Sequence, residues 1–197
     1  YEAVLLLGTT TDTEDMTGTV LTEQPVDVTE EQVRQVIASY VGTYEQVPPM
    51  YSAIKVNGQK LYDLARQGQV VERKPRPVTI YTLEILDMDL PRVRLRIRCS
   101  RGTYIRSLCR DIGESLSCGG CMEQLIRTRA CGFQAERSLR LNEIETHEKD
   151  GTLSGYITAI DEMYAELPKL TVAKAGDRLI HNGNKFRKEC IASMTEG

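Results

Sequence analysis

The chain contains only two histidines, no long apolar run and no glycine-rich phosphate loop, and each absence narrows the functions open to it. His147 and His181 lie in unrelated segments, which gives no support for a Ser/His/Asp or Cys/His catalytic arrangement. No apolar stretch approaches the ~20 residues of a membrane helix, and no basic-then-apolar leader is found, so neither membrane association nor secretion is predicted. Because the GxxxxGKS/T and GxGxxG patterns are both missing, a nucleotide-phosphate cradle is not indicated.

The six cysteines are too sparse for a disulfide scaffold and indicate a reducing compartment, so we expect a cytoplasmic protein. Cys118 and Cys121 have the spacing of a zinc or redox pair, but no second pair follows at a matching distance. A structural zinc site needs four ligands, commonly two such pairs. We therefore expect buried thiols and no metal site, with a zinc-dependent interaction protein as an alternative.

Charge is unevenly distributed along the 197 residues, although the net charge is only −3. Residues 1–50 hold one basic and nine acidic residues, whereas residues 51–140 hold 17 basic and nine acidic ones. Residues 141–197 hold seven basic and ten acidic residues. A basic middle between acidic ends is typical of a protein that binds a polyanion, and ordinary solvated charge is the open alternative.

Apolar periodicity and turn residues divide the chain into short elements. Thr29 is the expected N-cap of a helix, with Gln32 as its capping-box partner, and Gly42 ends that helix. A Thr- and Asp-rich loop is expected at 9–18, and an extended piece at 50–56. The predicted strands are 1–7, 19–23, 78–87 and 93–100; the other predicted helices are 60–67, 104–116, 139–149 and 156–164; a separate small β element begins at 167.

Four arginines alternate with apolar residues along the predicted strand 93–100 and the residue directly before it. Because side chains alternate between the two faces of a strand, they form one positive stripe. A solvated outer face is the simpler interpretation, since strands alternate in this way for solubility alone. The four are Arg92, Arg94, Arg96 and Arg98.

Two further segments are candidates for chemistry. RGTYIRSL places an arginine at a strand-to-helix junction, where a buried guanidinium would seek a carboxylate. Asp12 and Asp15 are either a carboxylate pair for acid–base work or, as we favour, acceptors of backbone N–H groups in a tight turn. Four tyrosines interleave with the basic middle segment and fit either base stacking or the edge of a core; they are Tyr51, Tyr62, Tyr81 and Tyr104.

Three long motifs resemble the bacterial tRNA pseudouridine synthase B family. They are LLLGTTTDTEDMTG near the start, VPPMYSAI followed by KVNGQKLYDLARQG, and CSRGTYIRSLCRDIG. The resemblance runs in order from residue 1 to about residue 165. It implies an α+β fold with a mixed, mostly antiparallel sheet flanked by helices, and a small C-terminal β element that is truncated here.

The resemblance implies isomerisation of a T-loop uridine of tRNA to pseudouridine. The base is flipped out, its glycosidic bond is cleaved, and the base is re-attached through C5, without cofactor or metal. The implied partner is the T-arm stem-loop of tRNA, with no membrane and no obligate protein partner. The implied domains are a catalytic domain without its N-terminal part at 1–165 and the start of a small RNA-binding domain at 166–197. Because the chain opens with Tyr, we expect it to be a piece of a longer protein.

The resemblance also assigns roles to individual residues. Tyr1 matches the tyrosine that stacks on the target base and is implicated in removing the C5 proton. Arg106 matches the arginine that pairs with the catalytic aspartate, Tyr104 matches a tyrosine of the pocket, and Leu125 matches the apolar residue that packs against the base. The segment 47–77 resembles an RNA-binding thumb insertion, in which three basic residues would contact phosphates; these are Lys55, Lys60 and Arg66.

One family motif does not occur in the sequence. The nucleophilic aspartate of the family lies in GxLDPxAxG, and Asp12 and Asp15 belong to a different motif, DTxDxxG. We therefore expect this chain to bind RNA without isomerising it, because loss of such a carboxylate costs orders of magnitude in rate. We also expect Arg106 to be an unpaired buried charge that loosens the cleft. An RNA-binding module or tRNA chaperone without catalysis is the alternative function.

Overall fold

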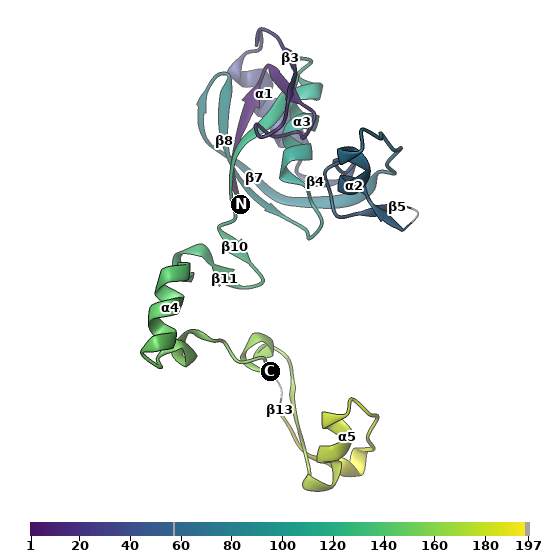
Figure 1. Cartoon of the computed structure of the whole chain (residues 1–197), viewed down its shortest axis with the longest axis vertical. Coiled ribbons are helices and arrows are strands. Elements are labelled where there is room, and N and C mark those ends of the chain that lie inside the picture. The colour runs from purple at the N-terminus through teal and green to yellow at the C-terminus, as the bar shows by residue number, and fades with distance from the viewer. Residues whose placement is uncertain (57, 196–197) are drawn as a thin grey trace. The chain divides into compact units, whose positions relative to one another are not determined.

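The computed structural model describes residues 1–56 and 58–195 (Figure 1). Residue 57 of the expected thumb and the last two residues of the expected C-terminal element lie outside this range. The chain divides into two compact units, Tyr1–Ser138 and Leu139–Gly197. The domain boundary at 165/166 stays a prediction.

A five-stranded antiparallel sheet forms the centre of the first unit, in the order β4-β7-β8-β1-β9. The expected α+β class and the mostly antiparallel sheet are confirmed. The strands are β1 (Glu2–Leu7), β4 (Gly42–Gln46), β7 (Arg76–Asp89), β8 (Arg92–Cys99) and β9 (Gly120–Ile126).

Two helices cover one face of this sheet and close the hydrophobic core (Figure 1). They are α1 (Glu30–Ser39) and α3 (Ile105–Ser115). Thr29 caps α1, and its capping box with Gln32 is present as predicted. Inward-facing residues of β1 and β8 pack against both helices. The fully buried residues of this core include Leu5, Leu7 and Leu95 of the strands and Val33, Leu108 and Ile112 of the helices.

The arginine stripe of β8 faces away from the core, and acidic neighbours compensate it. Arg92 forms a bidentate pair with Glu123 at 2.9–3.1 Å. Arg96 bonds Glu2 at 3.0 Å. The register also places Asp87 of β7 opposite Arg94, and the Arg98 guanidinium lies 5.2 Å from the ring centre of Tyr81. The structure therefore supports a solvated, internally balanced face over a surface that binds polyanions without selectivity.

Small hairpins extend from the sheet, and two of the sequence predictions are wrong there: the loop at 9–11 and the extended piece at 50–56. Residues 9–11, expected in a loop, pair with β3, because the Thr-rich sequence forms a hairpin before the tight turn begins. Residues 50–56, expected to be extended, form bends, and only the last two enter a strand. The elements are β2 (Thr9–Thr11), β3 (Val20–Glu23), β5 (Lys55–Val56), β6 (Gln59–Lys60), α2 (Leu61–Arg66), β10 (Arg129–Ala130), β11 (Phe133–Gln134) and the 3-10 turn Ala135–Arg137.

The described residues of the second unit include the α-helices α4 and α5 and a two-stranded sheet. α4 (Leu141–Lys149) confirms the helix predicted at 139–149, and β12 (Lys169–Val172) pairs with β13 (Ile191–Thr195), which confirms a β element after 167. The helix predicted at 156–164 is wrong, since only 3-10 turns form there. The remaining elements are α5 (Asp177–His181) and the 3-10 turns Leu153–Tyr156, Glu162–Tyr164, Lys174–Gly176 and Lys188–Cys190.

Within the described residues, no helix has the length and apolar character needed to cross a membrane.

Candidate functional site: an arginine held between a loop, a helix and the thumb base

The first turn of α3 and the loop between β2 and β3 meet at an ion pair. Arg106 Nη1 lies 3.0 Å from Asp15 Oδ2 and 3.4 Å from the carbonyl oxygen of Thr13. Arg106 Nη2 donates to the carbonyl oxygen of Tyr51. The two charged side chains are 21% and 13% exposed, so the pair is shielded from most solvent screening. The expectation that Arg106 is unpaired is therefore wrong: Asp15 is its partner.

Hydrogen bonds to the Asp15 carboxylate favour its ionised form in this loop. Its Oδ1 accepts hydrogen bonds from the Thr17 hydroxyl at 2.5 Å, the Thr17 backbone at 3.0 Å and the Thr13 hydroxyl at 2.9 Å. Burial acts to raise the pKa of Asp15, but these bonds and the one from Arg106 outweigh it and hold the pKa below its ordinary value. Asp12 accepts a bond from the Thr19 backbone at 2.7 Å, so the turn role predicted for both aspartates is confirmed.

The loop is also attached to the edge strand of the sheet. Met16 donates its backbone N–H to Met122 at 3.0 Å, and Met122 donates to Glu14 at 3.0 Å. Ion pairs to α3 and backbone bonds to β9 thus hold the loop on two sides. The carboxylate of Asp15 is fixed before any ligand arrives.

Tyr104 stands at the N-cap of α3, and a buried glutamine holds its backbone. Gln46, which is 2% exposed, accepts from the Tyr104 N–H at 2.9 Å and donates to the Tyr104 carbonyl at 3.1 Å. This reciprocal pair fixes the direction in which α3 leaves the sheet. The Tyr104 residue is half-buried next to Arg106.

Tyr1 directly precedes β1, where its backbone exchanges two hydrogen bonds of 2.9 Å with Ile97 of β8, and Leu125 lies on β9. Leu125 pairs with Ala3, two residues after Tyr1, so strand alternation places the three side chains on the same face of the sheet. Leu125 is 41% exposed, and the Arg127 guanidinium lies 5.4 Å from the Tyr1 ring centre. In the described part of the chain, no hydrogen bond or ion pair joins Tyr1 or Leu125 to Arg106.

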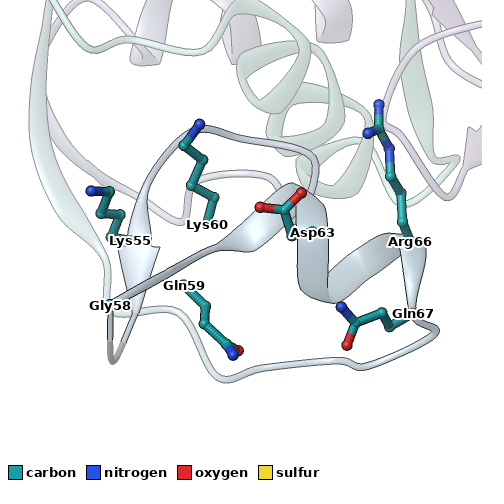
Figure 2. A pocket seen from close by; sticks show the side chains of 7 residues that line it. All are labelled: Lys55, Gly58, Gln59, Lys60, Asp63, Arg66 and Gln67. Atoms are coloured by element: carbon teal, nitrogen blue, oxygen red, sulfur yellow. The ribbon is translucent and has the colours of Figure 1, made fainter.

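The three predicted phosphate contacts line one pocket of about 610 Å³ on the expected thumb. Figure 2 shows Lys60 and Arg66 extending to the same side, with the Asp63 carboxylate drawn between them in this view. Tyr62 lies between the two cations: Lys60 Nζ donates to its hydroxyl at 2.8 Å, and the Arg66 guanidinium lies 5.4 Å from its ring centre. Lys55 completes the basic rim. That these residues contact RNA stays a prediction.

The cysteine pair offers no ligand set among the described residues. All six cysteines are free, and no group of three or more His, Cys, Asp or Glu side chains is placed to hold a metal ion in residues 1–56 and 58–195. Cys118 and Cys121 are buried, and the Cys121 sulfur contacts the sulfur of Met16 at 3.5 Å.

Sequence reasoning missed Glu14 and Arg110, which form a second ion pair beside the first. The available signal was the spacing of Arg106 and Arg110, four residues apart on one helix, matched by two consecutive carboxylates in the loop. Gln46 was missed as well, and nothing in the sequence of β4 marks it.

Comparison with known protein families shows to which family the chain belongs. Residues 1–105 match the model of the TruB family pseudouridylate synthase N-terminal domain, and residues 106–164 match the tRNA pseudouridylate synthase B C-terminal domain. The chain belongs to the TruB pseudouridylate synthase family. Family members are isomerases that modify RNA.

Curated relatives in this family are longer than the chain. It is 53% identical over 158 residues to the tRNA pseudouridine synthase B of Lachnoclostridium phytofermentans, covering 76% of the chain and 52% of the relative. It is 44% identical over 183 residues to that of Clostridium novyi, covering 93% of the chain and 62% of the relative. The chain therefore spans between about half and two thirds of these TruB relatives.

Solved structures support the same fold. A Cbf5–Nop10–Gar1 complex contains a chain with a TM-score of 0.69 and 25% identity, matched over 98% of this chain and 51% of its own length. An H/ACA RNP bound to a substrate RNA gives a TM-score of 0.65 at 21% identity, which shows the fold alone. The TruB assignment thus agrees with the five-stranded sheet and its two covering helices.

Proposed function

We propose that the chain carries the tRNA-binding surface and part of the active site of a T-loop uridine isomerase. The observation that carries this proposal is the position of Arg106, held at once by Asp15, Thr13 and Tyr51 where the loop, the helix and the thumb base meet. The chain spans only part of the length of its relatives. Its activity, its substrate and a cytoplasmic location are therefore part of this proposal.

The proposed reaction conserves every atom of the uridine. The bond between ribose C1′ and base N1 breaks, the bond between C1′ and C5 forms, C5 loses a proton and N1 gains one. No oxidant, cofactor or metal enters this balance. The base must first leave its stack, which costs a few kcal/mol that stacking on an aromatic side chain can offset.

Tyr1 and Leu125 are the proposed walls of the base pocket. Strand alternation places them on one face of the sheet, and the exposed side of Leu125 leaves apolar surface free for a base. Tyr1 would stack on the base and take part in removing the C5 proton, and Tyr104 would line the pocket beside it. Arg106 would meet the nucleophilic carboxylate with its remaining N–H groups, since in the described residues three of its five donors have partners.

Lys55, Lys60 and Arg66 are the proposed phosphate contacts of the thumb. They surround one open pocket, and their charge attracts the RNA backbone without reading its sequence. The GxLDPxAxG motif is not among the residues of this chain. We therefore expect the chain by itself to bind and unstack the target uridine but not to form pseudouridine.

A fluorescent pyrimidine at the target position of a T-arm stem-loop tests the base pocket. Binding should raise its fluorescence as the base unstacks, and Tyr1→Ala and Leu125→Ala should reduce that rise while leaving the affinity within a few fold. Val20→Ala is the matched control, because Val20 is 44% exposed on the β2–β3 hairpin. Binding with no fluorescence change would favour an RNA-binding module without a base pocket. Pseudouridine made by this chain alone would contradict the expected inactivity.

A further inference from the structure

A second, more buried ion pair lies one helical turn beyond Arg106. Arg110 Nη1 donates to Glu14 Oε1, and the Ser107 hydroxyl donates to Glu14 Oε2 at 2.5 Å. The Glu14 and Arg110 side chains are 10% and 18% exposed, and Ser107 is fully buried. Arg110 also contacts the Asp111 carboxylate at 2.6 Å. The pair is therefore built into the interior rather than placed on the surface.

The two ion pairs are arranged in parallel. Arg106 and Arg110 are four residues apart and share one side of α3, while Glu14 and Asp15 are consecutive in the loop. Glu14, which makes one of these contacts, adopts a φ of 66°, a left-handed conformation that is costly for a residue with a side chain. The loop thus holds Glu14 in a costly backbone conformation while both carboxylates contact α3.

The same arginines hold the base of the expected thumb. Arg110 Nη2 donates to the Val47 carbonyl at 3.1 Å, and Arg106 Nη2 donates to that of Tyr51. Arg73, on the chain leaving the thumb, donates to the Pro48 carbonyl at 3.1 Å. Residues 47–51 belong to no strand and contain two prolines. Their carbonyl groups therefore accept hydrogen bonds from these guanidinium groups, where a strand would have backbone N–H partners.

We infer that Glu14 and Arg110 are positioning residues, which lock the loop, α3 and the thumb base into one register. They act through the neighbouring Asp15–Arg106 pair and through Val47, and touch neither substrate nor reacting atoms. This role deepens the proposed function and rests on it for its effect on RNA. The arrangement is not explained by stability alone, because a buried ion pair is often no more stabilising than apolar side chains of similar size.

Amide hydrogen–deuterium exchange on the whole chain tests the inference without RNA. Glu14→Gln and Arg110→Met should speed exchange in the loop 12–19 and at Ser52, whose N–H donates to the Met50 carbonyl at 2.9 Å, with little change in the β1–β8 ladder. Arg110→Lys keeps a positive charge for Glu14 but lacks the second N–H group that reaches Val47, so it should restore protection of the loop and not of Ser52. Arg92→Gln, which breaks a surface pair with Glu123, is the matched control.

Ser107→Ala is a milder variant in case the charge variants do not fold. It removes one bond to Glu14 and should speed exchange in the loop alone. Exchange at 12–19 and at Ser52 that stays at the wild-type rate in every folded variant would overturn the inference. So would a uniform increase over the whole first unit, since that is the pattern of a merely structural pair.

The affinity for a T-arm stem-loop separates this inference from the proposed function. Glu14→Gln and Arg110→Met should each weaken binding by about tenfold, the size expected for residues that couple two sites. The double variant should bind no more weakly than the worse single variant, because both remove the same contact. If wild-type protein does not prefer the T-arm, the proposed function fails, while the exchange rates still decide the positioning role.

Discussion

Asp15 and Arg106 are 91 residues apart in the chain, yet their charged atoms lie 3.0 Å apart. Three other donors hold the aspartate, and two backbone carbonyls hold the arginine, so neither side chain is free to move alone. The pair joins the loop that follows β2 to the helix that packs on β1 and β9. Loss of this ion pair should lower the stability of the protein and alter the conformation of the thumb base.

Asp15→Asn should lower the free energy of unfolding by about 3 kcal/mol at neutral pH, because it leaves a largely buried guanidinium without its counter-charge. The pKa of Asp15 is below its ordinary value of 3.8 in the folded protein. Its stabilising contribution is therefore present above 3.8 and is lost as the pH falls through the lower folded value. Urea unfolding of both proteins should show a gap that closes below 3.8; a gap independent of pH would contradict this assignment.

Gly18→Ala should destabilise the same loop by about 1–3 kcal/mol, the range for overpacking a close contact. A Cβ at Gly18 would lie 2.2 Å from Thr13 Oγ1 and 2.3 Å from Asp12 Oδ1, two atoms that bond within the turn. Thermal unfolding measures the effect. Gly155→Ala is the control, because no atom lies within 4 Å of a Cβ there, and an equal loss at both positions would argue against the loop geometry.

Lys60→Gln together with Arg66→Gln should weaken T-arm binding and flatten its salt dependence. Each lost phosphate contact reduces the slope of log affinity against log salt by about 0.7–0.9. Titrations at several salt concentrations give that slope. Arg92→Gln removes one positive charge from the outer face of the sheet, where Glu123 balances it, and should leave the slope unchanged. Equal slopes for thumb and control variants would place the RNA elsewhere.

Metal analysis should find no stoichiometric zinc in the purified chain. Burial raises the pKa of the Cys121 thiol to about 11 and raises that of Cys118 as well, whereas zinc binds thiolates. Chelation should leave the melting temperature unchanged. One zinc per chain, lost in Cys121→Ser, would restore the zinc-dependent interaction protein as a hypothesis.

The sequence predicted the elements that depend on local signals. Thr29 and Gln32 form the expected capping box, and Arg106 lies at the expected strand-to-helix junction, where it pairs with a carboxylate as predicted for a buried guanidinium. It could not identify Asp15 as that carboxylate, because the pairing depends on how α3 packs across β1 and β9. The same limit hid Glu14, whose left-handed backbone has no signature in its residue type.

The wrong predictions have a common physical cause. Residues 50–56 have the apolar composition of an extended segment, but the Ser52 N–H donates to the Met50 carbonyl at 2.9 Å and Arg106 donates to the Tyr51 carbonyl, so the backbone bends there. Residues 156–164 have helical spacing, but their side chains are mostly exposed, so packing does not stabilise a full helix. In both places tertiary contacts, or their lack, decide the backbone.

The most direct test of the account is a binding titration of the chain with a T-arm stem-loop against a scrambled hairpin of the same length, at two salt concentrations. The account predicts a clear preference for the T-arm that persists at the higher salt, because the thumb and the base pocket are organised by Asp15, Arg106 and their neighbours. Equal, weak and strongly salt-dependent binding to both RNAs would contradict it, since the basic segment would then be no more than a general polyanion surface.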